Sequence, residues 1–297
     1  MTPVDVFVAW RDRALDRLLG VCPREILNAA PTRGAPGDGV RVAASLKHSI
    51  NELIATAGDT GANRLDYTRL SGSPAYREYR IASAALRMLD LTTLSSREAR
   101  LAFWINVYNA LVIDAVLSFH VRRSVTEGRL GLLAFFRRAA YAVASHRLSC
   151  DDIEHGILRD NRGHPFIPGP QFAPADPRFA LIVRPPDARV HFALNCASRS
   201  CPAISAYDVE QIERQLDLAA RSFVATDVDV EPSQGIVHVS RIFRWFASDF
   251  GGHAGVLTTL RRYLPDDDRR QWLQAHEGRV RLVYRPYDWG LNAAVPG

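Results

Sequence analysis

HFALNCASRSCP, residues 191–202, gathers a histidine, an amide and two of the chain's four cysteines into one short stretch. Residues 189–194 are rich in β-forming side chains and follow the turn-forming residues 184–187, so this segment is predicted to be a strand. Successive side chains of a strand point to opposite faces, which would place His191 and Asn195 together on one face.

A loop and a helix are predicted to follow this strand. Residues 197–200 are small or polar, and Pro202 prevents a simple continuation of a sheet. Asp208 has the sequence signature of a helix start, and apolar residues then recur on one helical stripe: Ile212, Leu216, Ala219, Ala220 and Phe223. A loop held between two regular elements is a common place for reactive side chains, so we expect the chemistry of the protein here.

The composition is that of a globular protein. The chain has 297 residues, 47% of them hydrophobic, which is enough for one large domain or two small ones. The formal net charge is +5, but the arginines are scattered and Lys47 is the only lysine. Nucleic-acid binding is not expected, because it usually shows clustered basic residues within a recognisable module.

No membrane span and no secretory leader are predicted. The most apolar stretch, residues 101–117, is interrupted by polar side chains and is too short for a span. Asp5 and residues 11–13 interrupt the place where the apolar part of a signal peptide would lie. The cysteines are irregularly spaced, which favours reduced thiols over a disulfide framework. We therefore expect a soluble cytoplasmic protein, whose oligomeric state stays open.

The whole pattern predicts an α+β fold, mostly helical, with a small and largely antiparallel sheet. Helical periodicity covers residues 4–27, 40–57, 79–89, 95–119, 121–148, 241–250 and 254–263, and strand alternation covers residues 236–240 and 279–284. The sheet is expected to join segments near Leu181, His191, Val237 and Leu282, since the first half lacks the regular alternation of a parallel sheet. We divide the chain into an N-terminal helical segment, residues 1–62, and a core domain, residues 63–297.

Polar side chains stand out in two of the predicted helices. In residues 95–119, which begin with a Ser/Glu capping pattern, Asn106 and Asn109 share a face of an otherwise apolar helix. These amides either bond to backbone in a buried turn or position a substrate. A second helix is predicted after Ser149, which forms a capping-box pattern with Asp152.

Glu154 and His155 lie in this second helix. Neighbouring residues on a helix point about 100° apart, so Glu154 is not expected to orient His155, and each needs a partner elsewhere. A lone helical histidine is more often structural than catalytic. Residues 161–187 form a long proline-rich loop that could cover a cleft.

Four blocks of the sequence resemble the domain of unknown function 547 family. They are residues 103–111, 152–159, 191–202 and 240–250, which occur in the family's order, and the resemblance covers roughly residues 65–292. The blocks that match the family pattern contain Glu154, His155, His191, Asn195, Cys196 and Cys201, whereas Cys22 and Cys150 lie outside its cysteine positions. The resemblance implies no reaction, because the family has no assigned activity. It favours the central pair of cysteines, and Cys22 is expected to be a packed thiol.

The leading hypothesis is catalysis by a thiolate, in a cysteine-dependent hydrolase or acyl transferase. Such a site would cleave an amide or thioester-type bond of a small molecule or peptide. Cys201 is the first candidate nucleophile, because it precedes a helix whose N-terminal dipole favours an anion, and Cys196 is the second. His191 or His155 would activate the sulfur, with Glu154 or an amide fixing the imidazole. The residues expected to bind substrate are Asn106, Asn109, Arg159, Asn195 and Ser200.

The residue types resemble those of papain-like and transglutaminase-like enzymes, which combine Cys, His and Asn or Asp on an α+β scaffold. In those enzymes the cysteine comes first, so the analogy requires a permuted order here and rests on residue types alone. His238, His253 and Asp288 lie downstream and would restore the usual order.

No cofactor is expected under this hypothesis, but three alternatives stay open. Cys196, Cys201, His155 and His191 have the ligand types of a structural zinc site. The two cysteines could instead close a reversible disulfide, although their spacing is not Cys-x-x-Cys. Finally, the cysteines could be buried apolar fillers in a non-catalytic binding module.

Overall fold

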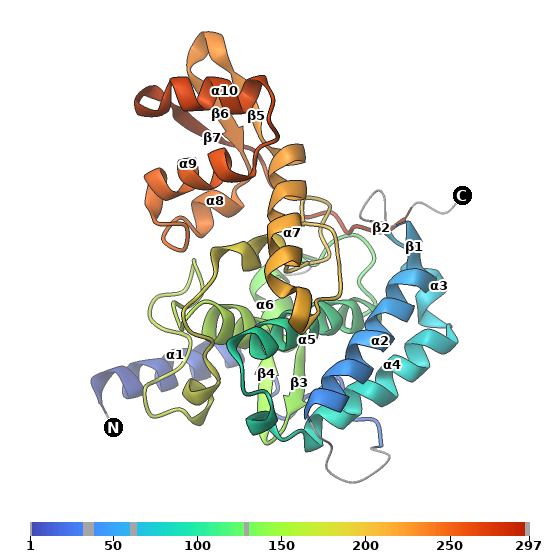
Figure 1. Ribbon diagram of the computed structural model, residues 1–297. Coiled ribbons are helices and arrows are strands. Elements are labelled where there is room, and N and C mark those ends of the chain that lie inside the picture. The colour runs from blue at the N-terminus through green and yellow to red at the C-terminus, as the bar shows by residue number, and fades with distance from the viewer. Residues whose placement is uncertain (1, 32–38, 60–63, 128–130, 295–297) are drawn as a thin grey trace.

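The computed structural model describes residues 2–31, 39–59, 64–127 and 131–294, and Figure 1 shows their arrangement. The helices are α1 (Pro3–Leu19), α2 (Gly39–Ala57), α3 (Tyr67–Ser71), α4 (Pro74–Ala84), α5 (Arg97–Ser118), α6 (Gly131–Arg138), α7 (Ile212–Asp227), α8 (Ile242–Trp245), α9 (Gly252–Tyr263) and α10 (Asp268–Ala275). The strands are β1 (Gly58–Asp59), β2 (Arg64–Leu65), β3 (Ala140–Val143), β4 (His146–Ser149), β5 (Asp229–Glu231), β6 (Ile236–Val239) and β7 (Arg281–Tyr284). The fold is α+β and mostly helical, as predicted.

Helix α5 runs through the first of two hydrophobic cores. Its start is fixed by Ser96, whose side chain accepts a hydrogen bond from the amide of Ala99. Every residue from 101 to 116 is buried, because α2, α3, α7 and a π-helix, Asp152–Leu158, pack around α5. By length and composition α5 could cross a membrane, but 89% of its most apolar window lies inside the protein, as in a core helix.

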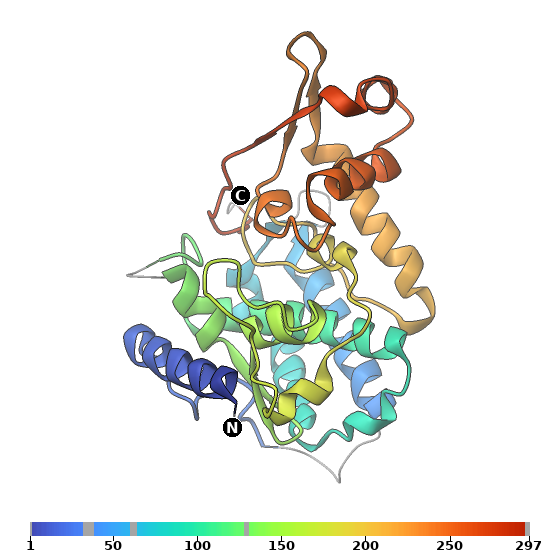
Figure 2. The same cartoon turned by 90° about the vertical axis from the view of Figure 1, so that its left-hand side faces the viewer.

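A second hydrophobic core lies among the C-terminal elements, which form the upper lobe in Figures 1 and 2. It is built from α7, α9 and the three-stranded sheet β5-β6-β7. Strand β6 pairs with β5 antiparallel and with β7 parallel. Phe192 packs into this core, whereas Val190 and Leu194 pack into the first one. The stretch around His191 therefore lies where the two cores meet.

The prediction of a strand over residues 189–194 is wrong. A 3-10 helix, Ala188–Phe192, occupies this place, and its first turn is capped by the Asp187 side chain, which accepts from the Arg189 amide. Leu181 likewise ends a 3-10 helix, Pro177–Leu181. A short apolar run is compatible with either a strand or a buried helical turn. Here the Asp187 cap and the preceding prolines favour the turn.

The sheets are smaller than expected. Of the four segments predicted to form one sheet, only those of Val237 and Leu282 pair, and they pair in parallel. The other paired strands, β1 with β2, β3 with β4 and β5 with β6, are antiparallel, so strand pairing is largely antiparallel as predicted. The papain-like or transglutaminase-like version of the fold stays a prediction.

Several helix boundaries also differ from the prediction. Helix α1 ends at Leu19 because Gly20 takes a left-handed conformation with φ of 65°, and Cys22 beyond it is exposed rather than packed. Residues 121–148 hold α6 and the hairpin β3-β4 in place of one helix, and residues 241–250 hold only the short α8. The predicted domain boundary at residues 62 and 63 lies outside the described residues, and α2 packs into the first core with α5.

Candidate active site

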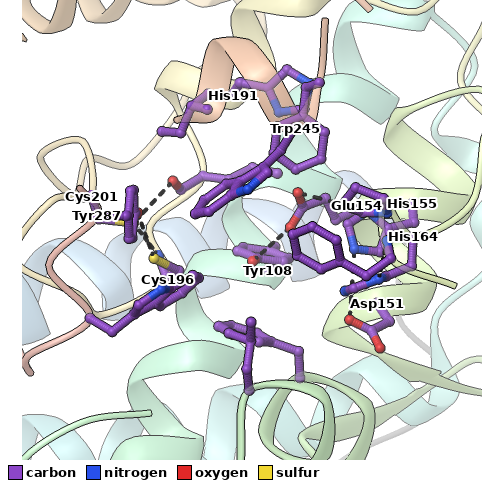
Figure 3. Close-up of a pocket in the computed structure, with 18 of the residues that line it drawn as sticks. Tyr108, Asp151, Glu154, His155, His164, His191, Cys196, Cys201, Trp245 and Tyr287 are labelled. Carbon is purple, nitrogen blue, oxygen red and sulfur yellow. Dashed lines mark hydrogen bonds and ion pairs between the residues drawn. The ribbon is translucent and has the colours of Figure 1, made fainter. Parts of the chain in front are cut away.

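A cavity opens between the two cores, and all five of the candidate catalytic residues line it. Its lining includes Tyr108 of α5, Glu154 and His155 of the π-helix, His164 and Phe166 of the following loop, His191, Cys196, Cys201, Trp245 of α8, Tyr287 and Trp289. In Figure 3 the two cysteines and Tyr287 lie on one side of the cavity, and His155, His164 and Asp151 lie on the other. Glu154 and Tyr108 lie between these two groups.

The sulfur of Cys196 is surrounded by hydrogen-bonding groups. Its Sγ lies 3.1 Å from the Ser198 hydroxyl and 3.2 Å from the Tyr287 hydroxyl. The Sγ of Cys201 accepts from the Cys196 amide at 2.7 Å and from the Tyr287 hydroxyl at 3.5 Å. Tyr287 thus contacts both sulfurs, and both are reduced thiols.

These surroundings separate the two thiols in acidity. Burial by itself would raise the pKa of Cys196, but hydrogen bonds from Cys201, Ser198 and Tyr287 lower that pKa to about 7. Burial and the neighbouring Cys196 sulfur raise the pKa of Cys201 well above that of a free thiol. Cys196 is partly exposed and Cys201 is buried, so the arrangement favours Cys196 as the ionised sulfur, which was the second candidate in the sequence.

The loop that carries the cysteines is held by three buried asparagines. Asn195 accepts from the Ala197 amide and donates to the Pro202 carbonyl. Asn109 donates to the Ala193 carbonyl and accepts from the Asn195 amide. Asn106 donates to the Tyr207 carbonyl and accepts from the Tyr207 amide. None of the three lines the cavity among the described residues, so they position backbone instead of touching a ligand there.

The residue that follows the acidic thiol has a strained backbone. Ala197 takes a left-handed conformation with φ of 60°, which an alanine adopts at a cost of about 1 kcal/mol. The neighbouring backbone explains how it is held, because the Ala197 carbonyl accepts from the Asn292 amide. Nearby, the Arg199 amide donates to the Gly290 carbonyl and the Asp288 amide donates to the Ser200 hydroxyl. Residues 197–200 and 288–292 are therefore joined side by side, and this brings Tyr287 to the sulfurs.

The dipole of a nearby helix does not explain why the pKa of Cys196 is lowered. The sequence predicted that a helix dipole would act on Cys201, but the next helical turn begins only at Val209, and α7 begins at Ile212. The favourable groups are instead the hydroxyls of Ser198 and Tyr287. Ser200, predicted to bind substrate, lines a neighbouring groove together with Cys201 and Pro202.

His191 belongs to a network with three charged residues, centred on Asp249. Its Nε2 donates to Asp249 Oδ2 at 2.8 Å, and its ring stacks on Phe246 with centroids 4.0 Å apart. Asp249 also accepts from Arg159 and Arg162. Burial opposes ionisation of Asp249, but the bonds from His191 and Arg159 hold the pKa of this carboxyl well below its usual range. Burial lowers the pKa of His191, so its imidazole is neutral near pH 7, with the Nε2 proton held by Asp249.

Glu154 and His155 occupy the π-helix, the rare wider helix that occurs often at functional sites. The predicted capping box is confirmed, since the Ser149 amide and hydroxyl both donate to Asp152 Oδ2. Glu154 accepts from the Tyr108 hydroxyl at 2.9 Å, and burial raises the pKa of this carboxyl. Glu154 was not expected to orient His155. Its Oε1 atom lies 3.8 Å from His155 Nδ1, which is too far for a hydrogen bond.

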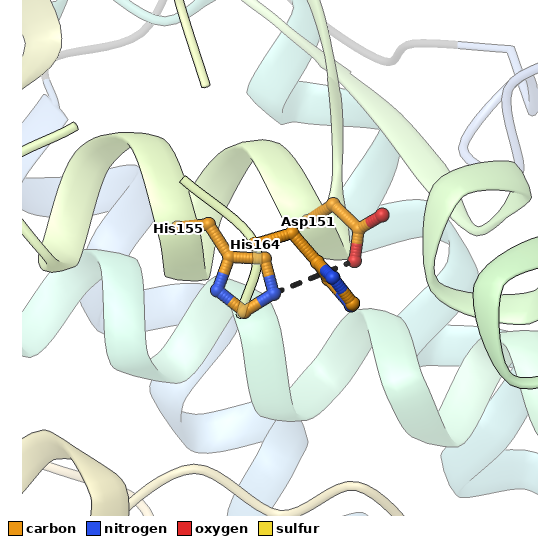
Figure 4. Close-up of side chains that lie close together, drawn as sticks. All are labelled: Asp151, His155 and His164. Carbon is orange, nitrogen blue, oxygen red and sulfur yellow. Dashed lines mark ion pairs between the residues drawn. The ribbon is translucent and has the colours of Figure 1, made fainter. Parts of the chain in front are cut away.

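Asp151, His155 and His164 form the one group of three potential metal ligands found among the described residues, with ligand atoms within 4.8 Å of one another (Figure 4). Their hydrogen bonds do not suit a metal. The Nδ1 atoms of His155 and His164 accept from Arg159 at 2.9 Å and from the Phe166 amide at 3.1 Å. Each Nε2 therefore carries a proton, whereas a metal-bound histidine donates from its other nitrogen.

Two buried histidines, His155 and His191, and the partly buried His164 should make the fold sensitive to mild acid. Burial lowers the pKa of His164 to about 4, and it also lowers the pKa values of His155 and His191. The unfolded chain binds protons below about pH 6.5 while the folded chain does not, so stability falls as pH decreases through this range. We expect His164→Asn, which keeps an acceptor for the Phe166 amide, to reduce the loss of unfolding free energy between pH 7 and 4.5 by roughly 2–3 kcal/mol. Urea unfolding at both pH values measures this, and equal losses in variant and wild type would contradict it.

Sequence reasoning missed several side chains of the cavity. Asp249 was visible within a family block, but nothing in its local sequence linked it to His191. Tyr287 is 91 residues from Cys196, and Tyr108 is 46 residues from Glu154, so neither contact leaves a local signal. The reserve residue Asp288 lies beside the loop of the cysteines without lining the cavity, and His238 contacts Glu231 in the upper lobe.

Comparison with known proteins supports the resemblance stated above. Residues 91–224 match the family described as "Protein of unknown function, DUF547", so the resemblance is confirmed over this range. The matched range contains both central cysteines, His155 and His191, while Asp249 and Tyr287 lie beyond it. No curated protein and no solved structure matches the chain with significant similarity.

Proposed function

We propose, on the premise that residues 91–224 belong to a family whose description assigns no activity, that this protein is a cysteine-dependent hydrolase or acyl transferase. The observation that carries the proposal is the sulfur of Cys196. It is partly exposed at a cavity, lies within 3.2 Å of two hydroxyl groups, and has a pKa lowered to about 7. A structural thiol buried in hydrocarbon has its pKa raised instead, as Cys201 and Cys150 do.

The first half of the reaction transfers an acyl group to the sulfur. The Cys196 thiolate adds to the substrate's carbonyl carbon and forms a C–S bond, and the bond to the leaving group then breaks. Glu154, whose raised pKa favours the protonated acid, gives its proton to the leaving group. Once the sulfur is acylated, the hydroxyls of Ser198 and Tyr287 can donate to the carbonyl oxygen as negative charge develops there.

The second half releases the acyl group. Water, or an acceptor alcohol, amine or thiol, attacks the thioester and loses a proton to His191. The C–S bond then breaks, Cys196 leaves as the thiolate, and the proton on His191 returns through solvent to Glu154. Asp249 holds Nε2 of this imidazole, and no described residue bonds its Nδ1, which leaves that nitrogen as the base. His191, oriented by a carboxylate and lining the same cavity as Cys196, completes a Cys-His-Asp set in this proposal.

The cavity favours an apolar or aromatic acyl group. Trp245, Tyr287 and Trp289 contact one another with ring centroids 4.5–5.6 Å apart, and all three line the cavity. His191 is neutral and offers no proton, and Glu154 is the only acid that the proposal assigns to the leaving group. Thioesters and activated esters therefore fit the site better than amides, whose leaving groups need stronger protonation.

The proposal predicts a covalent acyl-enzyme on Cys196. Wild-type protein incubated with S-phenyl thiobenzoate should gain the mass of one benzoyl group, and peptide mapping should place it on Cys196. Cys196→Ser should lower thioester cleavage at least about a thousandfold, as loss of a nucleophile does in other thiol enzymes. Cys201→Ser is the matched control and should still be acylated. Acylation that survives in the Cys196 variant, or that maps to Cys201, would overturn the assignment.

A zinc site is the second candidate, because Cys196, Cys201, His155 and His191 line one cavity. The hydrogen bonds favour the thiolate proposal over this one, since His191 Nε2 is held by Asp249 and His155 Nδ1 is held by Arg159. Elemental analysis of the purified protein separates the two. One zinc per chain, lost in Cys196→Ser, would support the structural zinc site and displace the enzyme proposal.

A further inference from the structure

Helix α1 exposes most of its large apolar side chains to solvent, whereas an ordinary surface helix turns its apolar face toward the protein. Its exposed residues are Pro3, Val4, Val6, Phe7, Trp10, Arg13, Ala14, Arg17 and Leu18. Trp10 and Leu18 are 67% and 66% exposed, and Val6 is 54% exposed. They recur at the spacing of one helical stripe, so a ridge of apolar side chains follows the outer face.

Three charged residues of α1, namely Asp5, Arg11 and Asp16, face the protein instead. Asp5 is buried and accepts from the amides of Thr2 and Ala175, and Asp16 accepts from the buried Arg137 guanidinium. Arg11 is buried and donates to the carbonyls of Pro168, Pro170 and Gln171. The helix is thus attached by charge and hydrogen bonds, which frees its apolar side chains for another contact.

The charge of the outer face indicates what it contacts. Arg13 and Arg17 are exposed there, and no acid among the described residues pairs with either of them. All three acids of α1, namely Asp5, Asp12 and Asp16, lie on the inner face or its edge. An outer face with apolar side chains, one tryptophan, two arginines and no carboxylate is complementary to an anionic phospholipid surface.

We infer that α1 is a membrane-surface helix, which lies in the plane of an anionic bilayer with Val6, Trp10 and Leu18 inserted among the acyl chains. Arg13 and Arg17 contact the lipid phosphates, as basic residues of in-plane helices do. This inference is independent of the thiolate chemistry. It concerns where the protein works, and no membrane span takes part in it.

The attachment of α1 connects this surface to the cavity. Arg11 donates hydrogen bonds to backbone carbonyls of the loop of residues 163–171, and the Phe7 ring lies against Gly169 of that loop. The same loop carries His164 and Phe166, which line the cavity, and Phe166 is itself 54% exposed. Lipid binding by α1 would therefore hold the cavity at a fixed orientation to the bilayer.

Vesicle flotation tests the inference with the full chain. Wild-type protein should float with vesicles of 30% phosphatidylglycerol in phosphatidylcholine, and not with phosphatidylcholine alone. The double variants Trp10→Ser/Leu18→Ser and Arg13→Glu/Arg17→Glu should each bind at least tenfold more weakly, and high salt should weaken wild-type binding. The changed side chains are exposed, so circular dichroism should be unchanged.

The matched control is Leu218→Ser/Arg221→Glu on α7, where Leu218 is 65% exposed, close to the value for Leu18. This control should float as wild type does. Absence of wild-type flotation at low salt, or an equal loss in the control, would overturn the inference. Self-association that disappears in Trp10→Ser/Leu18→Ser, without any flotation, would show that the face instead binds a second copy of the chain.

Discussion

Iodoacetamide should alkylate Cys196 in the native protein with a half-maximal rate near pH 7, while Cys201 and Cys150 stay unmodified until the chain unfolds. The midpoint follows from the pKa of Cys196, which the hydroxyls around its sulfur lower to about 7 although burial opposes this. A free thiol would show its midpoint at about pH 8.5. Rates are read by mass spectrometry of peptides after short exposures between pH 5.5 and 9.5, with the exposed Cys22 as internal reference.

Tyr287→Phe provides the sharpest control for this titration. The change removes one hydroxyl, 3.2 Å from the sulfur, and leaves the ring among Trp245 and Trp289. Without this donor the midpoint for Cys196 should move toward higher pH, while the stability of the protein should change little. If Cys201 is labelled first, or if the midpoint is unmoved by Tyr287→Phe, then the hydroxyls do not set the acidity and the thiolate proposal fails.

Asn109→Leu should destabilise the protein strongly, by about 3 kcal/mol. Asn109 is fully buried, and its amide pairs with the Ala193 carbonyl and the Asn195 amide. Leucine has a similar size but leaves both backbone groups without a partner, and each such group costs about 1–3 kcal/mol. Urea or guanidinium unfolding followed by circular dichroism measures the loss.

The same variant decides between the two roles foreseen for Asn109. If the amide positions backbone, the loss appears in stability, and Asn106→Leu, which breaks the equivalent pair of bonds to Tyr207, should lose a similar amount. If the amide instead binds substrate, stability would be kept and only the KM for a cleaved thioester would rise. Unchanged unfolding free energies in both variants would disprove the proposed role of Asn106 and Asn109 in holding the backbone.

The sequence was sufficient for features that depend on local pattern. Helix α5 was predicted within two residues at each end, because Ser96 caps it and its apolar residues extend for many turns. The strands around Val237 and Leu282 were found by alternation. The sequence also singled out residues 191–202, whose two cysteines and His191 line one cavity, while the chemistry predicted for them stays a proposal.

The predictions that failed concern features that depend on contacts between residues distant in sequence. The segment before Cys196 looked like a strand by composition, but no strand pairs with it in the described structure, and Asp187 turns it into a 3-10 helix. The choice of Cys201 over Cys196 relied on a nearby helix that begins too late. The acidity of Cys196 instead depends on Tyr287, and the orientation of His191 depends on Asp249, 58 residues further along the chain.

The strip of backbone that joins residues 197–200 to residues 288–292 has a consequence for biosynthesis. Tyr287 is made 91 residues after Cys196, so the ribosome exposes the sulfur long before its phenol partner exists. In the proposed mechanism, Cys196 therefore lacks one of its two hydroxyl partners until residues 287–292 have been synthesised and have docked beside residues 197–200. A chain that stops before Tyr287 should accordingly carry a less acidic Cys196 thiol.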